Sequence, residues 1–173
     1  MPIKGTRLKR LAFQFKALGD FLYWEGPLLS HLVNQHNEDF LFQWCGKDAT
    51  FNRWLLYKTN YDLLSRYFEG SISDLDLLLK NPDGFAYIVD VDHDIEWRQT
   101  FIVTLDDIPK EYLPNGSVNY DPGDFEPYTE QLRTYLDLHP DAASGPRLGK
   151  LYKLPEPSAT LFAEPPPPEY RTQ

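Results

Sequence analysis

The sequence contains one cysteine and no long apolar run. Cys45 alone can form neither an internal disulfide nor a cysteine-based zinc site, which agrees with a reducing compartment. No stretch reaches the roughly 18 apolar residues of a membrane-spanning helix, and the first residues lack the apolar segment of a secretion signal. We therefore expect a cytoplasmic protein with no membrane partner.

Motifs of catalytic and nucleotide-binding sites are also missing. The chain has no GxGxxG, no Walker loop and no HExxH, and Ser30 followed by His31 lacks the glycines of a nucleophile elbow. Cys45 lies in an expected strand, where we interpret it as a small buried hydrophobe. The histidines are not spaced as metal ligands: they are His31, His36, His93 and His139. We therefore expect no catalytic residue, no cofactor and no metal.

Acidic side chains outnumber basic ones, and the imbalance is uneven along the chain. The net charge is −9, with 26 Asp and Glu against 17 Lys and Arg. Residues 1–19 hold five basic side chains and no acidic one, so the remainder of the chain carries −14. Such a body repels a phosphate backbone, and only the basic arm, residues 1–19, could contact RNA or an acidic protein. We favour the simpler interpretation that this arm is a solvated leader.

Large apolar and aromatic residues are numerous enough for the core of one domain. Of the 173 residues, 42% are hydrophobic and 15% aromatic. A chain of this length buries roughly 70% of its unfolded surface. Eight of the 15 prolines lie in the last 34 residues, which predicts one domain over residues 1–139 and an extended proline-rich tail over 140–173. Leu151, Tyr152 and Phe162 are too apolar for a pure linker, so we expect them to dock on this domain or on a partner.

Alternating apolar residues predict several strands of one antiparallel sheet. Residues 11–16 alternate with period two, although residues 8–22 also fit a basic amphipathic helix that could lie on a membrane surface. We favour the strand. Residues 28–33, 40–44 and 51–57 are apolar runs separated by polar turns, which predicts a β-meander.

Two helices are expected after this meander. Thr59 can cap the first, which Gly70 ends, and its apolar face consists of Leu63, Leu64, Tyr67 and Phe68. Ser73 and Asp76 form a capping box for the second, between the hydrophobic residues Ile72 and Leu77. A third helical pattern covers residues 127–138.

Residues 85–92 and 95–104 predict a hairpin. In each run, apolar side chains alternate onto one face, and pairing these faces requires a loop with an odd number of residues, most simply residues 92–94. The expected pairs are Val91 with Ile95, Val89 with Trp97 and Asp90 with Glu96. Phe101 and Val103 then share the core face of Trp97. The fold class is therefore α+β: an antiparallel β-meander that can curl towards a small barrel, with two to three short helices and the extended tail.

Charged residues near the hairpin are candidates for binding a partner. Four carboxylates cluster at its tip, and they are Asp90, Asp92, Asp94 and Glu96. They could hold Mg²⁺ or Ca²⁺, but the glycine and the last glutamate of an EF-hand loop are missing, so we favour a solvated tip or a protein contact. Arg53 and Arg98 each adjoin a tryptophan, a pairing typical of interface anchors and equally of structural stacking.

Four segments of the first half carry a resemblance. They are residues 25–30 (EGPLLS), 41–45 (LFQWC), 52–55 (NRWL) and 67–73 (YFEGSIS). The stretch over roughly residues 20–80 resembles small uncharacterised bacterial proteins of the domain-of-unknown-function kind. This resemblance implies a bacterial cytosolic protein and brings no catalytic residues with it.

These observations favour a non-catalytic protein-interaction module, such as a small accessory or inhibitory subunit of a bacterial complex. Its expected contact residues are Arg53, Asp90, Asp92, Asp94, Glu96, Arg98, Leu151, Tyr152 and Phe162. One alternative is a small metal-assisted hydrolase that uses the acidic hairpin tip. The other is a nucleic-acid accessory protein that uses the basic arm.

Overall fold

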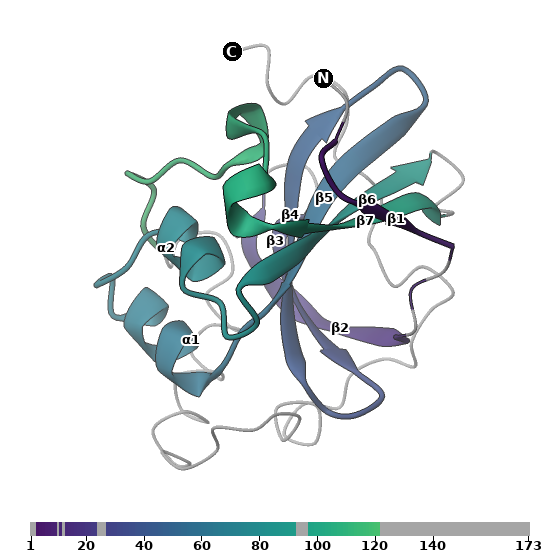
Figure 1. Cartoon of the computed structure of the whole chain (residues 1–173). Coiled ribbons are helices and arrows are strands. Elements are labelled where there is room, and N and C mark those ends of the chain that lie inside the picture. Colours follow the sequence, from purple (N-terminus) through teal and green to yellow (C-terminus); the bar gives the residue numbers. More distant parts are fainter. Residues whose placement is uncertain (1–2, 10, 12, 24–26, 93–96, 122–173) are drawn as a thin grey trace.

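The computed structural model describes residues 3–9, 11, 13–23, 27–92 and 97–121. They form a single sheet with two helices packed beside it (Figure 1). The elements in chain order are β1 (Thr6–Leu8), β2 (Phe15–Tyr23), β3 (Pro27–Asn34), β4 (Asp39–Lys47), β5 (Phe51–Lys58), α1 (Tyr61–Phe68), α2 (Asp74–Leu79), β6 (Phe85–Asp92), β7 (Trp97–Thr104), and the single-turn 3₁₀ helices η1 (Leu105–Asp107) and η2 (Lys110–Tyr112).

The sheet has the order β1-β7-β6-β5-β4-β3-β2, and every neighbouring pair is antiparallel. The predicted α+β meander is therefore confirmed. The sheet curls, which brings Phe15 of β2 onto Trp97 of β7 with ring centroids 6.3 Å apart. Among the described residues the edge strands β1 and β2 do not pair with each other, so the sheet stays open and does not close into the small barrel.

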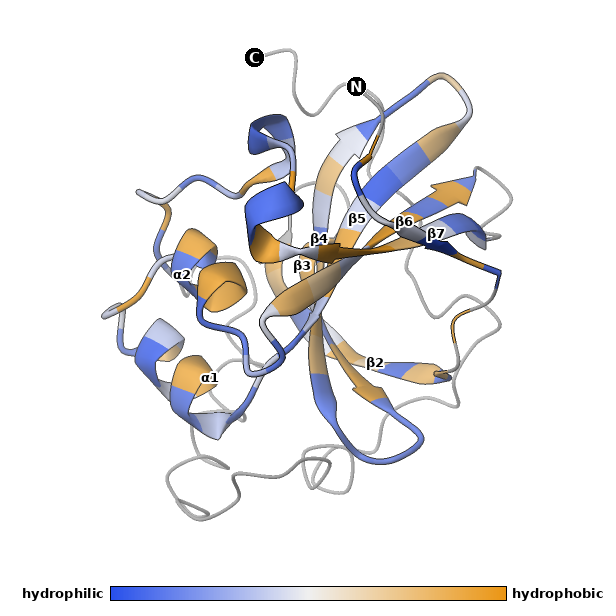
Figure 2. Ribbon diagram, in the orientation of Figure 1, coloured by the Kyte–Doolittle hydropathy of each residue, from blue (hydrophilic) through white to orange (hydrophobic). Residues whose placement is uncertain are grey.

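Each face of the sheet buries its own apolar cluster. On the face covered by the helices, Leu55, Tyr57 and Ile88 pack against the apolar sides of α1 and α2. The opposite, concave face is aromatic, and its members include Phe15, Phe40, Phe42, Trp44 and Trp54. Phe40, Phe42 and Trp44 therefore share one face, as side chains two residues apart in a strand do. Figure 2 shows hydrophobic residues on both helices and along the central strands.

The N-terminal segment is part of the sheet. β2 is a strand, which excludes the amphipathic helix over residues 8–22, but it begins at Phe15 rather than at residue 11. Thr6–Leu8 pair with β7, so the interpretation of the arm as a solvated leader is wrong for these residues. Gly5 permits the chain before β1 to lie close to β7, since a Cβ at this position would lie 2.7 Å from the backbone oxygen of Ile102. The side chains of Lys4, Arg7 and Lys9 remain exposed.

Both helix starts were expected, but one cap differs. Ser73 and Asp76 form the predicted capping box of α2. The N-cap of α1 is Asn60, whose side chain accepts a 3.0 Å bond from the N–H of Leu63, and not Thr59. Thr59 is buried and its hydroxyl has no partner among the described residues. Gly70 follows α1 with φ of 74°, a backbone conformation that favours glycine.

The hairpin of β6 and β7 forms, but its predicted register is wrong. Val91 faces Trp97, whereas Asp90 faces Gln99 and Ile88 faces Phe101. Between the pairs Val91–Trp97 and Asp90–Gln99, β7 has one extra residue, Arg98, which forms a β-bulge. After this bulge, the side chains of β7 lie on the faces opposite to those predicted. Phe101 therefore packs in the cluster under the helices, while Trp97 lies in the aromatic cluster.

The remaining expectations concern other parts of the chain. The helix over 127–138 and the tail from Pro140 lie outside the described residues. Among the described residues, no helix has the length and apolar character needed to cross a membrane.

Candidate functional site

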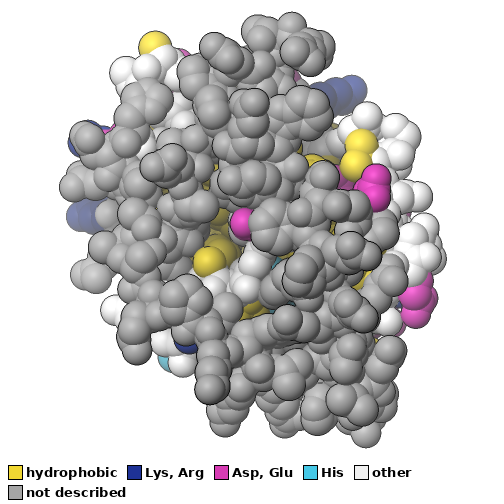
Figure 3. Space-filling view, turned by 180° about the vertical axis from the view of Figure 1, so that it is seen from behind, with side chains coloured by type: hydrophobic (Ala, Val, Ile, Leu, Met, Phe, Trp, Pro, Cys, Tyr) yellow, Lys and Arg dark blue, Asp and Glu magenta, His cyan; other side chains and the backbone are white. Residues whose placement is uncertain are grey.

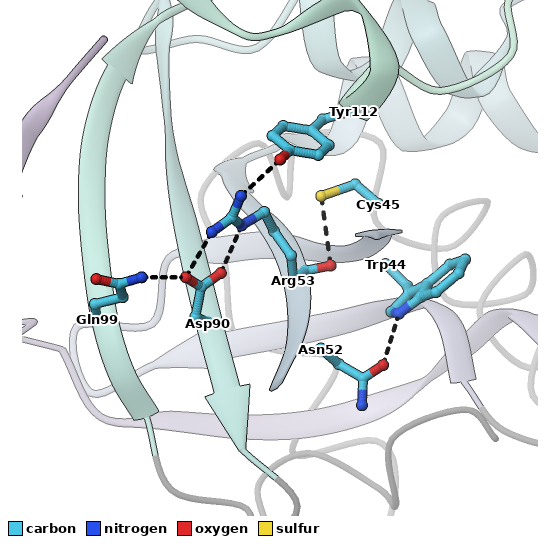
Figure 4. A network of polar contacts seen from close by, with 7 residues as sticks. All are labelled: Trp44, Cys45, Asn52, Arg53, Asp90, Gln99 and Tyr112. Atoms are coloured by element: carbon cyan, nitrogen blue, oxygen red, sulfur yellow. Dashed lines mark hydrogen bonds and ion pairs between the residues drawn. The ribbon is translucent and has the colours of Figure 1, made fainter. Parts of the chain in front are cut away.

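Four side chains from four elements form a polar network (Figure 4). Arg53 of β5 holds Asp90 of β6 with two bonds, from Nε to Oδ1 at 2.6 Å and from Nη2 to Oδ2 at 2.7 Å. Its Nη1 donates to the hydroxyl of Tyr112 in η2 at 2.6 Å. Gln99 of β7 donates to the same carboxylate at 2.7 Å. This network ties three strands and the segment after β7 together.

The side chains of this network are largely buried, and they hydrogen-bond to one another. The Asp90 side chain is fully buried, and 12% of the Arg53 side chain is exposed. Burial by itself would lower the pKa of Arg53, but the hydrogen bond and charge of Asp90 outweigh it and raise the pKa above its ordinary value. The guanidinium also lies over the rings of Phe51 and Tyr112. We interpret this network as structural support for the sheet.

The structure brings Arg53 and Asp90 together, which the sequence did not predict. Asp90 is fully buried against Arg53, so the expectation that it belongs to a solvated or partner-binding hairpin tip is wrong. Asp92 pairs with Arg98, whose side chain is 60% exposed. Two of the four tip carboxylates are thus already paired with arginines, which weakens the metal-site hypothesis. The other candidate contacts, Asp94, Glu96, Leu151, Tyr152 and Phe162, lie outside the described residues.

Other reactive side chains are also held inside the fold. Cys45 is buried, as predicted, and its thiol donates to the Arg53 carbonyl oxygen at 3.4 Å (Figure 4). The buried His31 pairs with Asp39, with 2.9 Å between Nε2 and Oδ1. Within the part of the chain that the structure describes, no three His, Cys, Asp or Glu residues are grouped so as to hold a metal ion.

A pocket beside α2 has a different character. Its cavity of about 200 Å³ lies between β2, β3 and β4 on one side and the segment of residues 112–118 on the other. Most of its lining is apolar: the residues are Leu22, Leu28, Trp44, Tyr112, Pro114 and Val118. Gln43, Asn115 and Asp74 add polar groups. Asp74 is the only acid that lines it among the described residues.

Asp74 is buried by the local structure around the start of α2. It is the first residue of α2, after the Ser73 cap, and it is only 3% exposed. Its backbone N–H donates to the carbonyl of Val118 at 2.9 Å, and Ser73 forms a bridge with Asn119. The segment after η2 thus lies over the start of the helix and shields the carboxylate from solvent.

The carboxylate of Asp74 is only half satisfied. Its Oδ1 is buried and has no hydrogen-bond partner among the described residues, and the nearest group that favours its charged form is the hydroxyl of Tyr67. Burial raises the pKa of Asp74 to about 6, and the Tyr67 hydroxyl opposes this rise only in part. A carboxyl with this pKa is mostly ionised at neutral pH, and it becomes protonated when the pH falls just below neutral.

The groups around Asp74 are neutral tyrosines and an amide. The hydroxyl of Tyr57 donates to Oε1 of Gln43 at 2.9 Å. Burial and the charge of Asp74 raise the pKa of both Tyr57 and Tyr67, so these hydroxyls stay protonated. No cation balances Asp74 in any described ion pair. The pocket therefore presents one negative charge in mostly apolar surroundings.

Sequence reasoning did not single out Asp74. An acid in the first turn of a helix is common because it favours the helix dipole, and such residues are usually solvated. Asp74 is instead buried, where residues 112–120 pass over the start of α2. Comparisons of the chain with protein-family models, with curated proteins and with solved structures each find no match.

Proposed function

We propose that the protein is a non-catalytic protein-interaction module and that the pocket beside Asp74 is its contact site. The observation that supports this is the pocket itself, an apolar cavity with one unbalanced buried acid. Recognition sites typically combine an apolar lining with a few polar groups that orient the ligand.

The use of the other polar groups supports binding rather than catalysis. Arg53 and Asp90, like His31 and Asp39, are bonded to each other within the sheet. These are the residue types from which acid–base and nucleophilic sites are built, and here they connect strands. Asp74 is accompanied by protonated tyrosines and an amide, a set suited to orienting a ligand.

Site-specific cross-linking tests the proposal. A photoreactive amino acid replaces Asn115, an exposed residue of the pocket lining, in the full chain expressed in its native host. The matched control carries it at Asp62, whose side chain is 75% exposed on α1. We expect one protein to copurify in stoichiometric amount and to cross-link from position 115 and not from 62.

Three outcomes would contradict the proposal. Equal cross-linking from both positions would mean that the pocket is not the contact site. Loss of the captured material on nuclease treatment would favour nucleic-acid binding through the basic arm. Absence of any stoichiometric protein would reject the interaction module.

A further inference from the structure

Residues 113–120, which we call the strap, connect the sheet to the start of α2. In Figure 1 this green segment runs outward from η2 and returns to α2. Its first end is fixed to the sheet, because the hydroxyl of Tyr112, the residue just before it, accepts a 2.6 Å bond from Arg53. A bond of 3.2 Å from the N–H of Val118 to the carbonyl of Asn115 holds the turn between its two ends.

The second end of the strap lies on α2. The carbonyl of Val118 accepts a 2.9 Å bond from the N–H of Asp74, and Asn119 forms an isolated bridge with the N-cap residue of the helix. Tyr120 then packs edge-on against Phe68 of α1, with ring centroids 4.9 Å apart. Among the described residues, the backbone contacts of the strap with α2 are confined to this short stretch. It is therefore the part of the strap that can separate from the helix.

The side chain of Asp74 lies in this same region and is not stabilised as an anion. Its Oδ1 is buried and has no hydrogen-bond partner in the described part of the chain. No lysine or arginine pairs with it in any described ion pair. Seen from behind, the visible lysine and arginine side chains lie towards the rim of the molecule, away from the acidic side chain near the middle (Figure 3). Water is therefore the partner that would stabilise the ionised carboxylate.

We propose that the second end of the strap opens more readily when Asp74 is ionised and closes when Asp74 is protonated, so that this acid controls entry to the pocket. Opening lets water hydrate the carboxylate, and the proton that the buried acid held is released to solvent. Opening also moves Val118 away from the cavity of about 200 Å³, which becomes a groove open to a partner. The inference rests on the proposed function in one respect, that the partner binds in this pocket.

The direction of the pH dependence follows from the two environments of the carboxyl. Its pKa is about 6 when buried, against an ordinary 3.8 when hydrated. Between these pH values the closed form holds a proton that the open form has released, so the opening equilibrium rises with pH and levels off above pH 6. From pH 4 to pH 7 we expect the opening constant to increase about fiftyfold.

Other titratable groups near Asp74 do not change charge in this range. Asp76, in the same helical turn, has its pKa lowered to about 2 by hydrogen bonds from Ser73 and Lys80, so it stays ionised. Lys80 pairs with it and stays protonated, since lysine titrates near pH 10. The remaining groups are tyrosines, which also titrate near pH 10 or above: Tyr57 of β5, Tyr67 of α1, Tyr112 of η2 and Tyr120 of the strap.

Hydrogen exchange at the amide of Asp74 tests the proposal in the full chain. This N–H is in the first turn of α2 and has no acceptor within the helix, so its bond to Val118 reports the strap alone. The N–H of Leu77 is the matched reporter of the helix, because it donates to Ser73 at 3.1 Å. NMR exchange rates at pH 4 to 8 are corrected for the intrinsic dependence on hydroxide. We expect the opening constant at Asp74 to exceed that at Leu77 at every pH and to show the about fiftyfold rise.

Two variants make the test specific. In Asp74→Asn the amide at position 74 should exchange with an opening constant that does not change with pH. Asp62→Asn removes the same charge at an exposed site of α1 and should keep the pH dependence of the parent. With the captured partner, the cross-linking yield from position 115 should rise between pH 5 and pH 7 in the parent and not in Asp74→Asn.

Several results would overturn the inference. They are an opening constant at Asp74 that stays level from pH 4 to pH 7, one that equals the constant at Leu77, or the same pH dependence in the parent and in Asp74→Asn. A cross-linking yield with equal pH dependence in both chains would reject control of partner entry. The exchange measurement uses no partner, so its failure is separate from that of the proposed function. Exchange that rises with pH, together with no cross-linking from position 115, would retain the charge-controlled opening and reject the pocket as the contact site.

Discussion

Arg53 and Asp90 stabilise the sheet as a pair, which makes each residue costly to remove alone. Asp90→Ala leaves the Arg53 guanidinium with one of its three hydrogen bonds and removes the acceptor of the Gln99 side chain. Breaking a buried ion pair in this way costs about 3–5 kcal/mol. We expect the free energy of unfolding in urea to fall by that amount.

The double variant provides the control for this prediction. In Arg53→Met with Asp90→Ala no buried charge is left unpaired, so the loss should be clearly smaller than the sum of the two single losses. Additive losses would mean that the two side chains contribute independently and that the network has no collective role.

Asp74 has the opposite effect, because its charge is unfavourable in the folded state. Its pKa is about 6 in the folded protein against an ordinary 3.8, so between these pH values the folded state binds more protons than the unfolded state. Stability therefore falls as the pH rises through this window. At pH 8 the burial of this charge costs about 3 kcal/mol.

We predict that Asp74→Asn is more stable than the parent at pH 8, by up to about 3 kcal/mol, and that the difference shrinks towards pH 4. Urea unfolding of both proteins at pH 4, 6 and 8 measures it. A variant that is less stable than the parent at pH 8, or a stability difference that does not change with pH, would show that the buried charge of Asp74 does not destabilise the folded state. A functional residue that lowers stability is a common compromise at binding sites.

The start of α1 depends on Asn60 rather than on Thr59. Asn60→Ala removes the side-chain acceptor of the Leu63 N–H and should lower the free energy of unfolding by about 1 kcal/mol. Thr59→Val keeps the shape and removes a buried hydroxyl that has no partner among the described residues. Thermal melting should show this variant unchanged or more stable. The reverse ranking would assign the cap to Thr59.

The pairing of β1 with β7 requires a glycine at position 5. A Cβ there would meet the backbone oxygen of Ile102 at 2.7 Å and the side chain of Val103, so Gly5→Ala must push the segment away. Overpacking of this kind costs about 1–3 kcal/mol. Hydrogen exchange should show the amides of β1 losing protection. Gly46→Ala is the control, since its Cβ would lie at an ordinary 3.5 Å from Tyr112.

We expect the curl of the whole sheet to depend on Trp97. Its ring stacks on Phe15 of β2 and also on Phe42 of β4, at centroid distances of 6.3 Å and 6.1 Å. Because Trp97 is only partly buried, we expect Trp97→Ala to cost towards the lower end of the about 3–5 kcal/mol known for buried aromatic residues.

Hydrogen exchange distinguishes loss of the curl from a local defect. In the Trp97→Ala protein, amides of β2 should lose protection together with those of β7, although the two strands are far apart in the sheet order. Leu79→Ala, at a side chain that is 46% exposed, should leave both strands protected. Deprotection confined to β7 would show that the stacking does not hold the sheet curved.

Local patterns were sufficient for most of the elements, with the exception of β1, which was interpreted as part of a solvated leader. Alternation located β3 to β7, and the capping box with its flanking hydrophobic residues located α2, because both signals depend only on side chains close in sequence. Short connections then make a meander the natural antiparallel arrangement. The cap of α1 was displaced by one residue, because Thr59 and Asn60 are both good capping residues and the sequence alone does not rank them.

Long-range features were decided by the tertiary structure. One extra residue at Arg98 reversed the alternation in β7, and no local signal marks a bulge in advance. It therefore took the assembled sheet to show that Asp90 faces Arg53 and that Phe101 and Trp97 lie on opposite faces. Asp74 reads in the sequence as an ordinary acid of a first helical turn. Its burial, and with it the pocket, exists because residues 112–120 fold over a helix that lies about 40 residues earlier in the chain.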